Sequence, residues 1–240
     1  MDIFIITGAS KGIGYELAKQ LKQNGKQVVG LARTNPGIDE EFIEIDLAET
    51  TLLPEIMTRI IDQYYEQATS FTLVNNAGIV DPIGLVGEIE TEMIVRALTV
   101  NLTAPMTLAN AFISRLAHFT GAKKIVNISS GAGRNPYEGW GVYCTTKAGL
   151  DHFSRVIDLE QRSAVNPVQI ASIAPGIIDT GMQETIRSSE ASNFPLVDRF
   201  ISYKEEGHLS SAEETARKLI AFLEQDFQRA EGPILDLRQL

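Results

Sequence analysis

The stretch Ile3-Phe-Ile-Ile-Thr-Gly-Ala-Ser-Lys-Gly-Ile-Gly14 decides the fold. It begins with a continuous apolar run, which is typical of a strand that is buried on both faces. Glycines follow at positions 8, 12 and 14 in the spacing G-x-x-x-G-x-G, and Tyr15–Gln23 then has helical spacing. Small residues let the backbone approach a phosphate, and the helix N-terminus supplies free N–H groups. The stretch therefore predicts the first strand, turn and helix of a nucleotide-binding domain.

The alternation of apolar strands and amphipathic helices continues to the end of the chain. It predicts an α/β protein: a three-layer, doubly wound Rossmann fold with a seven-stranded parallel sheet, forming one domain over residues 1–240. The expected strands are Ile3–Thr7, Gln27–Ala32, Phe42–Ile45, Phe71–Asn75, Lys124–Ser129, Val168–Ile173 and Ile234–Leu237. The later expected helices are Pro54–Gln67, Thr91–His118 with an interruption around Pro105, Tyr143–Gln161 and Ser211–Glu224.

The segment 177–209 is the irregular part of the pattern, with a proline at 195 and weak periodicity. Ligands of an open α/β sheet bind outside the carboxyl ends of the strands. A long segment after the sixth strand lies at that edge, so we expect it to cover a substrate. The alternative is that the segment is a surface loop without a function.

Composition excludes several classes of function. The formal net charge of -10, with basic residues scattered, argues against nucleic-acid and membrane-surface binding. The N-terminus has no basic leader, and no apolar stretch reaches the roughly 18 to 20 residues that span a bilayer, so a cytoplasmic location is expected. A single cysteine, Cys144, suits a reducing compartment. The three histidines show no metal-ligand spacing, and no metal is expected.

The end of the second expected strand indicates which dinucleotide is preferred. An acidic residue that binds the ribose of NAD is expected about 20 residues after the glycine turn, yet here Ala32-Arg33 stands at that point. A guanidinium binds a 2′-phosphate bidentately, and Lys11 in the glycine turn can add a second cation. NADPH/NADP+ is therefore the predicted cofactor. The alternative is that both cations are solvated surface charges.

Tyr143 and Lys147 lie four residues apart on an expected helix and so share one face. An ammonium beside a phenol lowers the phenol pKa, which would make Tyr143 a usable general acid for a carbonyl oxygen. Ser130 follows the fifth expected strand and can be brought close to this pair, where its hydroxyl would hold the carbonyl.

These residues resemble the short-chain dehydrogenase/reductase family over essentially the whole chain. The glycine turn Thr7–Gly14, the Asn75–Gly78 motif, Tyr143 and Lys147 stand at the family's spacing. The resemblance implies four catalytic residues: Asn101, Ser130, Tyr143 and Lys147. It implies cofactor contacts from Gly8, Ser10, Lys11, Gly12, Ile13, Gly14, Arg33, Asp46, Leu47, Asn76, Ala77, Gly78, Tyr143, Lys147, Pro175, Gly176, Ile178 and Thr180.

The resemblance also implies what each catalytic residue does. Tyr143 would protonate the substrate oxygen while the cofactor delivers hydride to the carbon. Lys147 would bind the nicotinamide ribose, Ser130 would orient the carbonyl, and Asn101 would hold a water in a proton relay to Lys147. Pro175–Thr180 would cradle the nicotinamide end.

Residues 129–147 are similar to the same stretch in bacterial benzil reductases, which are relatives of sepiapterin reductase. This resemblance implies a small-molecule carbonyl substrate, a vicinal diketone next to an aromatic ring or a pterin. Tyr137 and Trp140 can form an aromatic wall for it, or can simply pack the loop. Asp236 matches an aspartate that anchors the pterin in sepiapterin reductase, although a carboxylate exposed on a frayed strand is the alternative. The expected substrate contacts are therefore Ser130, Trp140, Tyr143 and Asp236.

Two other functions compete with carbonyl reduction. A nucleotide sensor could keep the fold and lose catalysis, although it would have no need for all four catalytic residues. An alcohol dehydrogenase would use the same residues in the oxidative direction. The family resemblance also implies a homodimer or homotetramer through the long helices at 91–118 and 143–161.

Overall fold

Seven parallel strands form the centre of the computed structural model, which describes residues 1–37, 41–225, 227 and 232–240. The strand order is β3-β2-β1-β4-β5-β6-β7, and every neighbouring pair is parallel. The doubly wound sheet predicted from the sequence is therefore confirmed. The strands are β1 (Asp2–Thr7), β2 (Gln27–Ala32), β3 (Phe42–Glu44), β4 (Ser70–Asn75), β5 (Ala122–Ile128), β6 (Gln169–Ala174) and β7 (Ile234–Asp236).

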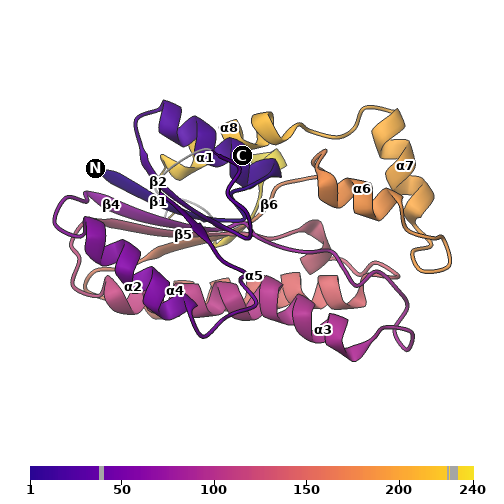
Figure 1. Cartoon of the computed structure of the whole chain (residues 1–240), viewed down its shortest axis with the longest axis horizontal. Helices are drawn as coiled ribbons and strands as arrows, with labels where there is room; N and C mark the ends of the chain where they lie inside the picture. Colours follow the sequence, from indigo (N-terminus) through magenta and orange to yellow (C-terminus); the bar gives the residue numbers. More distant parts are fainter. Residues whose placement is uncertain (38–40, 226, 228–231) are drawn as a thin grey trace.

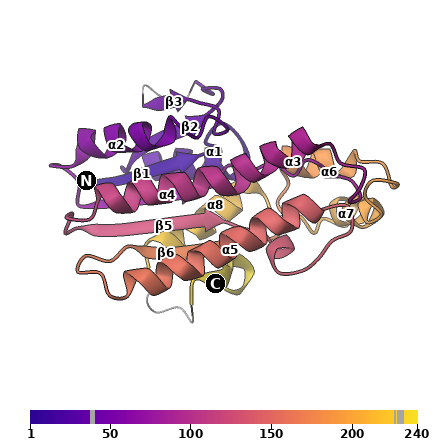
Figure 2. The same ribbon diagram turned by 90° about the horizontal axis from the view of Figure 1, so that it is seen from below.

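Helices cover both faces of the sheet (Figures 1 and 2). One face carries α1 (Gly12–Gln23) and α8 (Ala212–Leu223), and the other carries α2 (Leu53–Tyr64), α4 (Ala104–Arg115) and α5 (Gly141–Gln161). Successive side chains of a strand point to opposite faces. In β1, Ile3 and Ile5 accordingly pack against α2 and α4, whereas Phe4 and Ile6 pack against α1 and α8. Apolar residues on both faces explain why β1 reads as a continuous apolar run.

The long helical region at 91–118 is divided differently from the expectation. It consists of α3 (Thr91–Leu98), a π-helical turn (Thr99–Thr103) and α4. The interruption thus comes before Pro105, which lies in the first turn of α4. A proline is tolerated there because the first-turn N–H groups have no partner within the helix.

The irregular segment 177–209 contains two short helices, α6 (Gly181–Arg187) and α7 (Val197–Glu205). Figure 1 shows both at one end of the molecule, beyond the carboxyl end of β6. Helices this short carry too few turns to produce a clear period in the sequence. Ile186 of α6, Phe194 between the helices and Phe200 of α7 pack with Trp140 and Tyr143 in a third core cluster that is separate from the two sheet faces.

Buried polar side chains tie α5 to the sheet. Asn75 donates to Asn127 Oδ1 at 2.8 Å, and Asn127 donates to Ser154 Oγ at 2.9 Å. All three side chains are buried, so each lost bond would leave a polar atom without water. This chain of bonds fixes the position of α5 relative to β4 and β5.

Gly133 allows the turn after β5 to touch α5. A Cβ atom at Gly133 would lie 2.8 Å from the backbone carbon of Lys147, whereas a Cβ at Gly131 would have no atom within 4 Å. We therefore expect Gly133→Ala to lower the free energy of unfolding by about 1–3 kcal/mol through overpacking. Gly131→Ala is the matched control and should retain the parent's stability. Denaturant unfolding measures both, and equal stability of the two variants would contradict the packing described.

Candidate active site

A hollow with a volume of about 490 Å³ crosses the carboxyl edge of the sheet. Its lining follows the strands in their spatial order, from Arg33 and Asp46 after β2 and β3 to Ser130 and Pro175 after β5 and β6. Of the predicted site residues, the structure brings into this lining all except Gly14, Asn101 and Asp236. Residues far apart in the sequence thus meet at one edge, as expected for a doubly wound sheet.

The glycine turn forms the middle of the hollow. Gly8 and Gly12 have φ values of +69° and +58°, a conformation that residues with a side chain rarely adopt. A Cβ at Gly8 would also lie 2.9 Å from the Cα of Ala77. Lys11, the residue before α1, makes no side-chain cap with the first turn of the helix. The N–H groups of that turn are therefore left for an anion in the hollow.

Gly14 has a packing role that differs from the expected cofactor contact. A Cβ at this position would lie 2.4 Å from both Asn76 Nδ2 and the carbonyl oxygen of Gly8. Asn76 in turn donates to the carbonyl oxygen of Thr7 at 2.9 Å. The glycine is thus required because the helix starts directly against the turn and the Asn76 side chain.

Asp46 and Arg33 lie at the end of the hollow beside β2 and β3. Asp46 accepts a hydrogen bond from the Ala48 N–H at 3.0 Å and pairs with Arg96 at 3.0 Å. The pKa of Asp46 lies below its usual value. The largest cause is the hydrogen bond from the Ala48 N–H, and the positive charges of Arg96 and Arg33 add to it. Its negative charge is therefore compensated by cations. Arg96, which sequence reasoning missed, also lines this end.

Tyr143 and Ser130 lie together at the other end of the hollow. Ser130 hydrogen-bonds to the Tyr143 hydroxyl, which by itself lowers the phenol pKa, but burial dominates and raises the pKa of Tyr143 to about 12. This differs from the expected lowering by Lys147. The Lys147 ammonium donates to the Ile128 carbonyl at 2.8 Å and lies 5.8 Å from the centre of the Tyr143 ring. The phenol is consequently protonated near neutral pH.

Lys147 has a second buried neighbour, Asp151, one helical turn further along α5. Burial lowers the pKa of Lys147 to about 8, and the negative charge of Asp151 opposes this shift. The Asp151 carboxylate accepts from Ser172 Oγ at 2.6 Å and pairs with Arg134 at 3.3 Å. Sequence reasoning missed Asp151, although its spacing of four residues from Lys147 is the signal that places both on one helix face.

Asn101 lies on the π-helical turn and is almost fully buried. Its amide oxygen accepts from the Ile79 N–H at 2.8 Å, and its amide nitrogen donates to the Ile79 carbonyl at 2.8 Å and to Thr146 Oγ1 at 3.3 Å. The side chain thus clamps the loop after β4 against α5. Its side-chain bonds go to these groups, and the water relay to Lys147 stays a prediction.

Aromatic and apolar side chains surround Tyr143. Trp140 is 5% exposed, its ring centre lies 5.5 Å from that of Tyr143, and it stacks on Phe194 at 4.7 Å. Tyr137 lies against Trp140 at 5.4 Å.

The helices α6 and α7 contribute lining residues that the sequence did not predict, because the periodicity of these helices is weak. These residues are Gly181, Met182, Gln183, Ile186, Arg199, Phe200 and Tyr203.

Asp236 was expected to contact the substrate, but it is not among the described residues that line the hollow. Its carboxylate binds the guanidinium of Arg238, with a distance of 2.9 Å from Arg238 Nε to Oδ1. Arg238 is the residue that lines the hollow, and its side chain lies over Gly176. The Asp236 carboxylate is thus already paired with Arg238.

The described residues contain no group of three or more histidine, cysteine or acidic side chains placed to hold a metal ion. Within the same residues, no helix has the length and apolar character of a membrane span.

The doubly wound sheet and the hollow at its carboxyl edge define a Rossmann-type domain. The family model described as short chain dehydrogenase matches residues 2–191, and the chain belongs to this family of nicotinamide-dependent oxidoreductases.

Two relatives and one solved structure show how far the similarity extends. A benzil reductase ((S)-benzoin forming) of Bacillus subtilis is 39% identical, over 100% of this chain and 99% of its own length. The sepiapterin reductase of Rattus norvegicus is 28% identical, over 93% of this chain and 92% of its own. The structure of a short-chain dehydrogenase/reductase from Saccharomyces cerevisiae superposes with a TM-score of 0.84 at 24% identity, covering 99% of this chain and 96% of that one.

Proposed function

We propose that this protein is an NADPH-dependent carbonyl reductase that transfers hydride to one carbonyl of an aromatic or pterin-linked vicinal diketone. The observation that carries the proposal is the buried Tyr143, hydrogen-bonded to Ser130 and next to an aromatic wall. The similarity to benzil and sepiapterin reductases supports the same substrate class. We further propose a cytoplasmic location and a homodimer or homotetramer.

The lining of the hollow fits a nicotinamide dinucleotide. Glycine backbone and the uncapped first turn of α1 suit the pyrophosphate, and Lys11 and Arg33 suit a 2′-phosphate. Pro175, Gly176, Ile178 and Thr180 would hold the nicotinamide end, beside Lys147. When bound, NADPH supplies the hydride that reduces the carbonyl carbon.

The chain's own residues supply the proton and the orientation. Ser130 would donate a hydrogen bond to the carbonyl oxygen, and Tyr143 would transfer its phenolic proton to that oxygen as negative charge develops. The Lys147 ammonium would stabilise the phenolate that Tyr143 becomes. Asn101 acts as a positioning residue because it clamps the loop after β4 against α5.

The same geometry weighs against one competing function, a sensor without catalysis. Oxidation of an alcohol would use the same residues in reverse, so the proposed direction rests on the expected preference for NADPH and on the similarity to benzil and sepiapterin reductases. A sensor without catalysis has no need for a phenol and a serine hydroxyl bonded together at the end of an aromatic-lined hollow.

Replacing Tyr143 by Phe tests the proposed proton donor. We expect NADPH-dependent reduction of benzil to fall by about 10²–10⁴-fold, the usual contribution of a general acid, while NADPH binding is retained. Tyr65→Phe, which changes a tyrosine that packs on Phe119 away from the hollow, is the control and should keep the parent rate. Absorbance of the reduced nicotinamide follows turnover. A Tyr143→Phe variant as fast as the parent would disprove the assignment.

Replacing Arg33 by Asp tests the preferred dinucleotide. The carboxylate would repel a 2′-phosphate and accept a hydrogen bond from a free 2′-hydroxyl, so the ratio of kcat/KM for NADPH over NADH should fall by at least about 10-fold. Arg59→Asp on α2 makes the same charge change outside the hollow and should leave the ratio unchanged. An unaltered ratio in Arg33→Asp would remove this residue from cofactor selection.

The pKa of Lys147 predicts how the rate depends on pH. Because the charged ammonium stabilises the phenolate, reduction should slow as the pH rises through about 8, where Lys147 loses its proton. Asp151→Asn removes the negative charge that raises the Lys147 pKa, so the decline should begin at lower pH. The exposed ion pair of Asp158 with Arg162 makes Asp158→Asn a suitable control. Identical pH profiles of kcat for the parent and Asp151→Asn would refute this role of Asp151.

A further inference from the structure

A row of aromatic rings leads away from Tyr143 along the hollow. The Trp140 ring centre lies 5.5 Å from that of Tyr143 and 5.2 Å from that of Phe200, which in turn lies 5.8 Å from that of Tyr203. The row ends at Arg199, whose guanidinium carbon is 5.3 Å from the centre of the Tyr203 ring. A flat substrate with its carbonyl at Tyr143 would therefore direct its far side toward Arg199.

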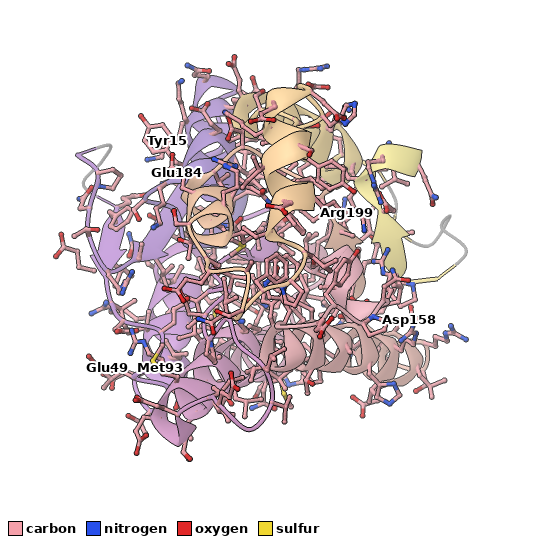
Figure 3. The ribbon with its side chains drawn as sticks, turned by 90° about the vertical axis from the view of Figure 1, so that its right-hand side faces the viewer. Tyr15, Glu49, Met93, Asp158, Glu184 and Arg199 are labelled. Atoms are coloured by element: carbon pink, nitrogen blue, oxygen red, sulfur yellow. The ribbon has the colours of Figure 1, made fainter. Side chains whose placement is uncertain are left out.

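Arg199 is held at this end of the hollow by its own helix. Its Nε donates to the Tyr203 hydroxyl one turn later in α7, which leaves the two terminal nitrogens for a ligand. Figure 3 faces this end of the molecule and shows Arg199 beside α7, on the side of the yellow C-terminal segment. Arg238, from that C-terminal segment, lines the same hollow.

The two arginines differ in how their charge is compensated. Arg238 binds the Asp236 carboxylate through two nitrogens, so this pair is close to neutral. No ion pair within the described part of the chain involves Arg199. The acidic residue among the described lining residues is Asp46, which pairs with Arg96 at the opposite end of the hollow. The end with the aromatic row therefore carries an uncompensated positive charge.

We propose that the preferred substrate is an anionic aryl diketone, whose ring carries a carboxylate on the side remote from the reduced carbonyl, bound by Arg199. This inference rests on the proposed function and adds the charge of the substrate to it. A planar guanidinium donates two parallel hydrogen bonds to a carboxylate, which makes Arg199 suited to this group. The aromatic row supplies the flat surface, and the arginine sets which end of the molecule enters first.

A matched pair of substrates tests the inference: benzil with a carboxylate at the 4-position of one ring, and the methyl ester of the same compound. We expect the parent to show a kcat/KM about 10-fold higher or more for the acid, chiefly through KM, as for a charged hydrogen bond. Arg199→Gln should bring the ratio close to one, because it lowers kcat/KM for the acid far more than for the ester. Lys218→Gln removes one positive charge from the outer side of α8 and should keep the parent's ratio.

The outcomes distinguish a failure of the carboxylate inference from a failure of the proposed reductase function. If benzil and the ester are reduced and the acid has no advantage, or if the advantage survives in Arg199→Gln, the carboxylate inference is overturned and the proposed reductase stands. If none of the three diketones is reduced by enzyme that binds NADPH, the proposed function fails, and the inference fails with it. A ratio that falls in Arg199→Gln and also falls as salt concentration rises supports an exposed charge–charge contact.

Discussion

The buried polar contacts beneath α5 are the constraint on which the site depends. Asn127 joins β5 to Ser154, and Asp151 joins the same helix to Ser172 on β6 and to Arg134. The Asn127, Asp151, Ser154 and Ser172 side chains are buried, so their hydrogen bonds are costly to break. They hold the middle of α5 against β5 and β6, and this fixes the first turns of the helix, which carry Tyr143 and Lys147.

The position of α5 also determines the charge state of the site. Tyr143 and Lys147 are 7% and 4% exposed, and burial disfavours the charged form of each, so the phenol pKa rises and the ammonium pKa falls. Tyr143 is therefore an acid that keeps its proton until negative charge develops on a bound carbonyl oxygen. Lys147 remains charged below about pH 8 because Asp151 opposes the effect of burial. The same helix thus places the reacting groups and sets their charge states.

The sequence predicted those parts of the structure whose position follows from the local pattern of residues and from their spacing along the chain. The seven strands, the turn at Gly8 and Gly12, and the meeting of Ser130 with Tyr143 follow from apolar runs and from residues at strand ends. It could not predict the parts that depend on three-dimensional partners. The lowering of the Tyr143 pKa was expected from Lys147 alone, whereas the fold buries the phenol and directs the ammonium to Ile128. Asp236 was considered without Arg238, its partner in the last turn of the chain.

The most direct test of the account is the fate of the hydrogen on the nicotinamide. NADPH that carries deuterium at the transferred position of C4 would be mixed with the enzyme and benzil, and the benzoin product examined by mass spectrometry and NMR. Direct hydride transfer within the hollow predicts one deuterium on the carbinol carbon and a hydroxyl proton from Tyr143 that exchanges with solvent. Benzoin formed without deuterium at that carbon would contradict the account.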